Sequence, residues 1–159
     1  LGECKRHDHP DLETVVKICL ATGARWSEAE NLRKSQLTEY KVTYINTKGR
    51  KNRTVPISKE LYESLPHDKK GRLFSDCYGA FRSALERTGI GLPAGQLTHV
   101  LRHTFASHFM MNGGNILVLQ RVLGHTDIKM TMRYAHFAPD HLEDAVKLNP
   151  LSQVIIVKK

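Results

Sequence analysis

The stretch that decides the fold runs from residue 99 to residue 136 and reads HVLRHTFASHFMMNGGNILVLQRVLGHTDIKMTMRYAH. It holds five of the chain's nine histidines, three arginines and one tyrosine, but a single carboxylate, Asp127. A buried helix pair would be mostly apolar, and a solvated surface would mix both signs of charge. The composition of this stretch therefore predicts a site for an anion.

The charge of the whole chain supports the same interpretation. The net charge is +8, and two long windows contain no acidic residue, one between Glu39 and Glu60 and the other between Glu86 and Asp127. Two windows that carry Arg, Lys and His without carboxylates predict one positive face suited to phosphate, with nucleic acid as the partner. The alternative is a pair of solvated basic patches that bind nothing.

Length and composition limit the remaining possibilities. A chain of 159 residues can form one domain with a sizeable core, and 40% hydrophobic residues argue against general disorder. The apolar run VIIV near the C-terminus is far shorter than the roughly 20 residues of a membrane span, so no membrane partner is expected. Three widely spaced cysteines predict reduced thiols without a metal-binding pair. The missing initiator Met predicts a fragment cut on its N-terminal side.

Hydrophobic periodicity and turn signals predict a mostly helical α+β domain with one small antiparallel sheet. Strands are expected at 41–47 and 53–57, joined as a hairpin by a basic turn, and Pro56 suits an edge strand or a strand end. The tail SQVIIVKK predicts an isolated strand without a local partner. Helices are expected at 11–22, ending at Gly23, and at 27–32, 58–65, 76–89, 96–111, 115–123, 127–134 and 139–147.

The cationic candidates for the anion site lie on separate predicted elements. Arg25 and Arg102 could each direct forked donors at phosphate oxygens and stabilise the charge that develops on a pentavalent phosphorus. His99 and Arg102 are three residues apart, so a helix projects both from one face. His125 follows Gly124 at the predicted end of a helix and could donate a further hydrogen bond.

Two more residues could carry the proton transfer and the bond making. Lys48, in the hairpin, could protonate a leaving oxygen. Tyr134, nine residues after His125, has a phenol that can attack phosphorus and form a covalent ester. No metal is required if arginines supply the electrostatic stabilisation.

Each candidate also has an ordinary structural explanation. His99 and His103 have the i,i+4 spacing of a zinc-protease helix, but that motif needs Glu where this chain has Val100. His103 is better explained as a buried histidine satisfied by the backbone. A lone tyrosine is usually a core or surface residue, and Arg25 alone would be an ordinary ion-pair partner. The order and spacing of the residues together favour the chemical interpretation.

Four separated boxes resemble the tyrosine recombinase (phage integrase) family, in the family's order. TGARWSEAENL matches its T-G-x-R-x-x-E-x-x-x-L box, and TKGRKNRTVPI matches its hairpin lysine followed by R-x-V-P-[IL]. HVLRHTFA matches H-x-L-R-H-T-F-A, and LGH is followed by a tyrosine nine residues later. The resemblance covers residues 11 to 136, and it implies that residues 1–150 form the family's catalytic domain.

The resemblance also implies a role for each site residue. Glu28 would orient the site, Lys48 would be the general acid with Lys51 as the alternative, and the basic hairpin residues Arg50, Lys51 and Arg53 would contact DNA. A 5′-hydroxyl of another strand would then attack the phosphotyrosine and rejoin the strands without a cofactor. The phosphate site would consist of Arg25, Lys48, His99, Arg102 and His125, with Tyr134 as the nucleophile that leaves a 3′-phosphotyrosyl bond.

Expected partners follow from the same resemblance. They are double-stranded DNA, accessory DNA-bending proteins, and further copies of the chain in a dimer, or a tetramer on DNA, held by exchange of the tail at 151–159. The expected location is the cytoplasm of a bacterial host. Two alternatives are a type IB topoisomerase and a non-catalytic DNA-binding regulator, which would be expected to lack at least one of the six site residues. The target sequence, and whether Tyr134 attacks in its own site or a neighbour's, stay open.

Overall fold

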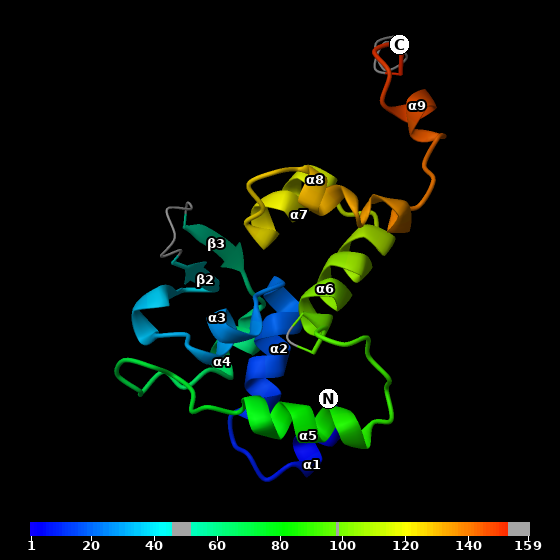
Figure 1. The fold of residues 1–159 in the computed structure, drawn as a ribbon. Coiled ribbons are helices and arrows are strands. Elements are labelled where there is room, and N and C mark those ends of the chain that lie inside the picture. Colours follow the sequence, from blue (N-terminus) through cyan, green and yellow to red (C-terminus); the bar gives the residue numbers. More distant parts are fainter. Residues whose placement is uncertain (46–51, 98, 153–159) are drawn as a thin grey trace.

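The structure, a computed structural model, describes residues 1–45, 52–97 and 99–152. It is mostly helical with one small antiparallel sheet, which confirms the predicted fold class (Figure 1). In chain order the elements are α1 (Gly2–Arg6), α2 (Leu12–Thr22), α3 (Trp26–Glu30), the 3₁₀ helix η1 (Lys34–Gln36), β1 (Leu37–Thr38), β2 (Lys41–Tyr44), β3 (Arg53–Pro56), α4 (Lys59–Glu63), α5 (Tyr78–Arg87), α6 (Val100–Met111), α7 (Ile116–Leu123), α8 (Lys129–Met132), the 3₁₀ helix η2 (Ala135–Phe137) and α9 (Asp144–Lys147).

Helix α2 is the central element of the main core. It packs against α1, α3 and α6, and most of its apolar side chains are buried, Val15 and Ile18 completely. Figure 1 shows it between the sheet and α6. Its apolar spacing in the sequence therefore marked a helix that is buried on most of its surface.

Gly23 ends α2 and lets three helices meet. Its φ of 64° is left-handed, and its N–H donates to the Cys19 carbonyl at 2.9 Å. A Cβ at this position would lie 2.6 Å from Phe105 Cδ1 in α6 and 2.8 Å from Leu123 Cδ2 in α7. The helix end predicted at Gly23 is confirmed, and the close approach of α6 and α7 requires glycine there.

The sheet has the order β1-β2-β3, and both pairs are antiparallel. Tyr44 lies opposite Arg53 and Val42 opposite Val55, with Val42, Tyr44 and Val55 all buried. The predicted hairpin strands are confirmed, although the first ends at Tyr44, and their basic turn lies outside the described residues. Strand β1 was not predicted because two residues carry no measurable alternation. Pro56 lies on β3, an edge strand of the described sheet.

Helices α6 and α7 enclose a second, smaller buried cluster. Its buried members are Ala106, Met110, Leu119, Leu123 and Tyr134. The candidate nucleophile is thus part of a packed unit with these two helices. That packing sets the position of its hydroxyl.

Each predicted helix is present with somewhat different bounds, and two of the differences have a clear physical cause. The second helix begins at Trp26 and not Ser27, because the Glu28 carboxylate accepts the backbone N–H of Arg25 at 2.8 Å and makes Arg25 the N-cap. Residues 139–147 form only the short helix α9. Leu142 and Val146 are 79% and 72% exposed there, so packing does not extend the helix.

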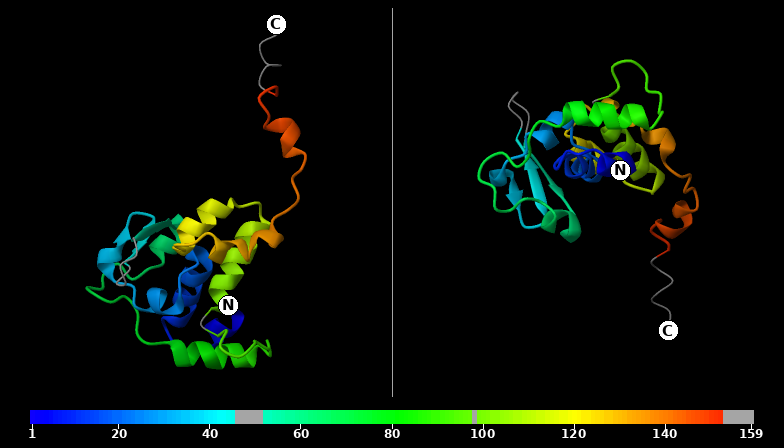
Figure 2. Two further views of the ribbon diagram at one scale, coloured as in Figure 1. Left: turned by 45° about the horizontal axis from the view of Figure 1, so that its top comes forward. Right: turned by 90° about the horizontal axis from the view of Figure 1, so that it is seen from below.

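The end of the described chain projects away from the body of the molecule. Helix α9 and residues 148–152 lie apart from the sheet and from α2 in every view (Figures 1 and 2). The predicted tail strand, residues 153–159, lies outside the described residues. None of the helices in the described ranges has both the length and the apolar character that crossing a membrane requires.

Gly23→Ala should destabilise the fold, because it combines a strained left-handed backbone with a clash against Phe105 and Leu123. We expect a loss of about 2–4 kcal/mol in the free energy of unfolding, measured by urea denaturation. Gly79→Ala in α5 is the control, since its Cβ would meet open space. That variant should be stabilised by up to about 1 kcal/mol. Equal stability of the two variants would contradict the packing described here.

Candidate active site

A cavity of about 300 Å³ opens beside the N-terminal half of α6. Three arginines and three histidines contribute to its wall, and none of the described residues that line it is acidic. A cavity with such a wall attracts an anion and is not neutralised by a carboxylate of its own. The lining residues are Arg25, Gln96, His99, Arg102, His103, His125, Met130, Arg133 and Tyr134.

Arg102 is the buried base of this cavity, with 5% of its surface exposed. Its Nη1 donates to the Gly23 carbonyl at 2.7 Å and its Nη2 to the Leu123 carbonyl at 2.6 Å. Both carbonyls belong to helix C-terminal ends, where partial negative charge stabilises a cation. Two of its five N–H groups make these bonds, and the others can donate to an anion.

Arg102 keeps its positive charge although it is buried. Burial lowers the pKa of Arg102 to about 10, and the neighbouring charges of Arg25 and Arg53 act in the same direction. A guanidinium with this pKa is still protonated at neutral pH. The helix carbonyls therefore hold a positive charge in a site where other positive charges gather.

Glu28 connects Arg25 to the rest of the site. Its carboxylate accepts the backbone N–H of Arg25 and, at 3.3 Å, the Arg25 guanidinium. It also receives both Nη atoms of Arg53, at 2.9 and 2.6 Å. Burial acts to raise the pKa of Glu28, but the hydrogen bonds and charge of Arg53 outweigh it, so the pKa lies below its usual range. Glu28 thus contacts the two arginines Arg25 and Arg53 at once.

Arg53 does not lie where its predicted DNA contact requires. Its side chain is 7% exposed, stacks over the Tyr44 ring at 4.6 Å and donates from Nε to the Val122 carbonyl at 2.9 Å. Together with the two bonds to Glu28, these contacts turn the guanidinium inward. The direction of this side chain could not be predicted, because composition and spacing do not reveal which way a basic side chain points.

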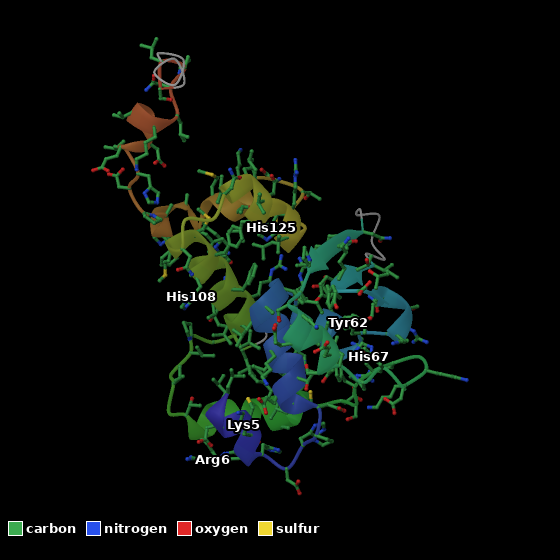
Figure 3. All side chains as sticks on the ribbon, turned by 180° about the vertical axis from the view of Figure 1, so that it is seen from behind. Lys5, Arg6, Tyr62, His67, His108 and His125 are labelled. Atoms are coloured by element: carbon green, nitrogen blue, oxygen red, sulfur yellow. The ribbon has the colours of Figure 1, made fainter. Side chains whose placement is uncertain are left out.

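His99 and His125 both reach the cavity, from different helix ends. His99 is the N-cap residue of α6. His125 directly follows the left-handed Gly124 that ends α7, and its Nδ1 lies 2.9 Å from the buried Thr131 hydroxyl. Figure 3 labels His125 at this end of α7, away from His108 farther along α6. The structure thus brings together the two histidines that the sequence analysis assigned to the phosphate.

Tyr134 lies against α6 of its own chain, with 5% of its surface exposed. Its hydroxyl forms a short hydrogen bond with Nδ1 of His103. Burial raises the pKa of Tyr134, against the opposing effect of Arg133 and Arg102. The sequence analysis predicted that the backbone would satisfy His103, and that was wrong: the Tyr134 hydroxyl is its partner. The i,i+4 spacing between His99 and His103, which places both side chains on one face of a helix, was the sequence signal that could have assigned His103 to the site.

The remaining basic residues of the 99–136 stretch divide between the cavity and its surroundings. Arg133, which the sequence analysis did not select, lines the cavity with its guanidinium 5.8 Å from the Tyr134 ring centre. His108 and His136 instead line a neighbouring groove, and Arg121 lines another on the far side of α7. The histidines of this stretch therefore do not all surround one anion.

Three predicted site residues, Lys48, Arg50 and Lys51, lie outside the described residues. Within the described ranges, no group of His, Cys, Asp and Glu side chains forms a metal site. The arrangement that remains is a cavity with fixed guanidinium donors and a phenol at its edge. Such a cavity can bind a phosphate diester and present a nucleophile to it.

Known proteins resemble this chain in sequence and in fold. The family model described as "Phage integrase family" matches residues 3–141. The integrase of Escherichia phage 186 is 92% identical over 154 residues, which are 97% of this chain and 46% of that protein. The solved catalytic domain of bacteriophage HP1 integrase is 68% identical, with a TM-score of 0.92 over 95% of this chain and 89% of that one.

A more distant solved structure is the XerH site-specific recombinase bound to a palindromic difH substrate in a post-cleavage complex. It is 25% identical, with a TM-score of 0.64 over 86% of this chain and 45% of that one. The chain spans about half the length of the curated relatives that it matches, 46% for the phage 186 protein.

Arg53→Met should destabilise the fold by about 3–5 kcal/mol at neutral pH, because it leaves the Glu28 carboxylate half-buried without its main partner. The pKa of Glu28 is lower in the folded protein than in the unfolded chain. Its ionised carboxylate therefore stabilises the fold fully above the pKa of the unfolded chain, and this stabilisation is lost as the pH falls through the pKa of the folded protein. The difference in the free energy of unfolding between Arg53→Met and wild type should therefore be smaller in acid. Denaturant unfolding at several pH values measures this.

Arg82→Met is the matched control, because Arg82 makes an exposed i,i+4 pair with Glu86. It should change stability by less than about 1 kcal/mol. If Arg53→Met instead kept full stability and lowered the salt dependence of DNA binding, Arg53 would be a phosphate contact after all.

Proposed function

Because the chain belongs to the phage integrase family, we propose that it cleaves and rejoins DNA strands through a 3′-phosphotyrosyl intermediate, as a site-specific recombinase that integrates and excises phage DNA. The observation that carries this proposal is the meeting of Arg25, Arg102 and Tyr134 at one cavity without acidic lining among its described residues. A phosphate diester is the ligand that fits both the donors and the phenol.

The two arginines would clamp the non-bridging oxygens of the scissile phosphate. Arg102 is held by helix carbonyls and Arg25 by Glu28, so both donors are oriented before DNA arrives. Preorganised donors stabilise the charge that develops on phosphorus without reorganising during the step. His125 would add a hydrogen bond to a phosphate oxygen.

Tyr134 would be the nucleophile. Its oxygen forms the bond to phosphorus while the bond from phosphorus to the 5′-oxygen breaks, and that oxygen leaves as a hydroxyl. We assign the proton for the leaving oxygen to Lys48, with Lys51 as the alternative, and an assisting role around the tyrosine to His99. The reverse attack by a 5′-hydroxyl conserves the energy of the diester, so the proposal requires no cofactor.

The DNA partner fits the charge of the chain and the chemistry of a relative. The net charge is +8, and the XerH structure contains a cleaved DNA substrate. We propose double-stranded DNA as the substrate here, in the cytoplasm of a bacterial host, with Arg50 and Lys51 contacting its backbone and accessory DNA-bending proteins shaping it. Tyr134 and the arginines line one cavity of a single chain, which supports attack in cis.

We also propose that the projecting C-terminal segment is covered by a second copy of the chain. Leu142, Val146, Leu148 and Leu151 are each more than 70% exposed on it. Several large apolar side chains exposed together on one short segment are unusual for a monomer and typical of an interaction site. Exchange of residues 151–159 between copies would bring the whole projecting segment against the second copy. Its exposed apolar side chains would then be buried, and the contact would hold a dimer, or a tetramer on DNA, together.

Tyr134→Phe should abolish covalent attachment to DNA while leaving DNA affinity within about threefold, because the phenol oxygen makes the covalent bond and few binding contacts. The measurement incubates fragmented phage and host DNA with each protein, denatures with SDS, and sequences the DNA that stays attached. Fragment ends clustered at one locus would identify the target site. Adducts formed by Tyr134→Phe would overturn the nucleophile assignment.

Deleting residues 151–159 should shift the protein to a smaller species in sedimentation velocity, at concentrations where the intact chain associates. The described residues of this segment, Leu151 and Ser152, do not line the phosphate cavity, so phosphate binding should persist. A deletion variant with unchanged oligomeric state would rule out the proposed exchange of this segment.

A further inference from the structure

Among the described residues, the Tyr134 hydroxyl is hydrogen-bonded by a side chain that the proposed chemistry does not use. Nδ1 of His103 forms a short hydrogen bond to that hydroxyl, from α6 of the same chain. The two rings lie with their centres 5.8 Å apart and tilted by 45°. His99, to which the proton transfer around the tyrosine was assigned, has its ring centre 6.2 Å from that of His103.

We infer that His103 is the general base of strand cleavage: it holds the Tyr134 hydroxyl through Nδ1 and accepts its proton as the phenol oxygen attacks phosphorus. This inference rests on the proposed recombinase function and deepens it. A general base must be within hydrogen-bond reach of the proton that it removes, and His103 meets this requirement directly.

Packing holds Tyr134 against α6, the helix that carries His103. Ala106 and Met110 of α6 lie in the same buried cluster as Tyr134, so the helix that carries His103 and the residue that it holds are packed together. The Tyr134 backbone N–H donates to the Thr131 carbonyl at 3.0 Å, and Thr131 is fully buried. Tyr134 is buried in this cluster, and His103 is carried by the helix that contributes Ala106 and Met110 to it, so the hydrogen bond is formed before DNA binds.

The charges around His103 keep its imidazole neutral and so able to accept a proton. Burial lowers its pKa, and Arg133, His99 and Arg102 lower it further. Arg25 and His125 also line the cavity, and His136 and His108 line the groove on its other side. All of these groups are basic and none of the described lining residues is acidic, so nothing there favours the imidazolium before DNA binds.

The step balances in atoms and charge. The Tyr134 oxygen bonds to phosphorus, its proton moves to Nδ1 of His103, and the bond from phosphorus to the 5′-oxygen breaks. The leaving oxygen takes its proton from a separate acid. The bound phosphate carries negative charge, which stabilises the imidazolium that forms beside it. On rejoining, the imidazolium returns the proton to the departing phenol oxygen.

The first test measures the rate of covalent complex formation on an oligonucleotide of the recovered target site. His103→Asn keeps a neutral acceptor near the Nδ1 position but cannot accept the proton, and it should react about 10²–10⁴-fold more slowly. Wild type should slow as pH falls through the lowered pKa of His103, because the imidazolium cannot act as a base. His103→Asn should lack this acid limb. His108→Asn, on the same helix outside the cavity, is the matched control and should behave as wild type.

A second substrate distinguishes the proton that the base removes from Tyr134 from the proton that the acid gives to the leaving 5′-oxygen. Replacing the 5′-bridging oxygen by sulfur gives a leaving group that needs no proton, so a defect in the acid is rescued and a defect in the base is not. His103→Asn should stay slow on this substrate, and Lys48→Ala should recover. Recovery of His103→Asn, or a wild-type rate and pH profile for it, would overturn the inference while leaving the proposed function intact. Adducts formed by Tyr134→Phe would overturn the proposed function itself.

A readout that does not need activity is the nitrogen NMR of the full-length protein without DNA. His103 should be neutral with Nδ1 unprotonated and Nε2 carrying the proton, and Tyr134→Phe should shift its Nδ1 resonance. A protonated Nδ1 that does not respond to Tyr134→Phe would show that His103 is a structural donor and would overturn the inference.

Discussion

The site depends on the way buried arginines bind the ends of helices. Arg102 donates to the last carbonyls at the ends of α2 and α7, and Arg53 donates to Val122 in α7 and to Glu28 in α3. The Arg53 bonds connect the sheet, through β3, to α3 and α7, and the Arg102 bonds connect α6 to the ends of α2 and α7. Helix ends have carbonyls without intrahelical partners, and a buried guanidinium has donors that need acceptors, so each satisfies the other.

This arrangement explains how so much positive charge can gather without unfolding the site. Among the described residues, Glu28 is the carboxylate that contacts both Arg25 and Arg53, and it is not part of the described cavity wall. Arg102 is balanced by carbonyl dipoles, which neutralise less than a full charge would. The cavity therefore keeps a net attraction for an anion, and burial, together with repulsion among its cations, lowers the pKa of Arg102 and that of His103.

The same packing gives Tyr134, the proposed nucleophile, an environment different from that of a surface phenol. Burial raises the pKa of Tyr134, so the hydroxyl keeps its proton at rest. The neighbouring imidazole is neutral for the opposite reason, since burial and nearby cations disfavour its charged form. A protonated phenol beside a neutral base is a resting state that can react only when a phosphate arrives to be attacked.

The sequence by itself determined the helices with long apolar periods, the strands of the hairpin, the glycine that ends α2, and the residues that could bind and attack a phosphate. Periodicity and motif spacing are local properties, and a single chain displays them directly. The direction of each basic side chain was decided by tertiary structure alone: Arg53 faces inward to Glu28, Arg133 enters the cavity, and His103 meets Tyr134 across 31 residues of chain. A charge count treats all arginines and histidines alike, whereas the role of each depends on which helix end or hydroxyl the folded chain brings within 3 Å of it.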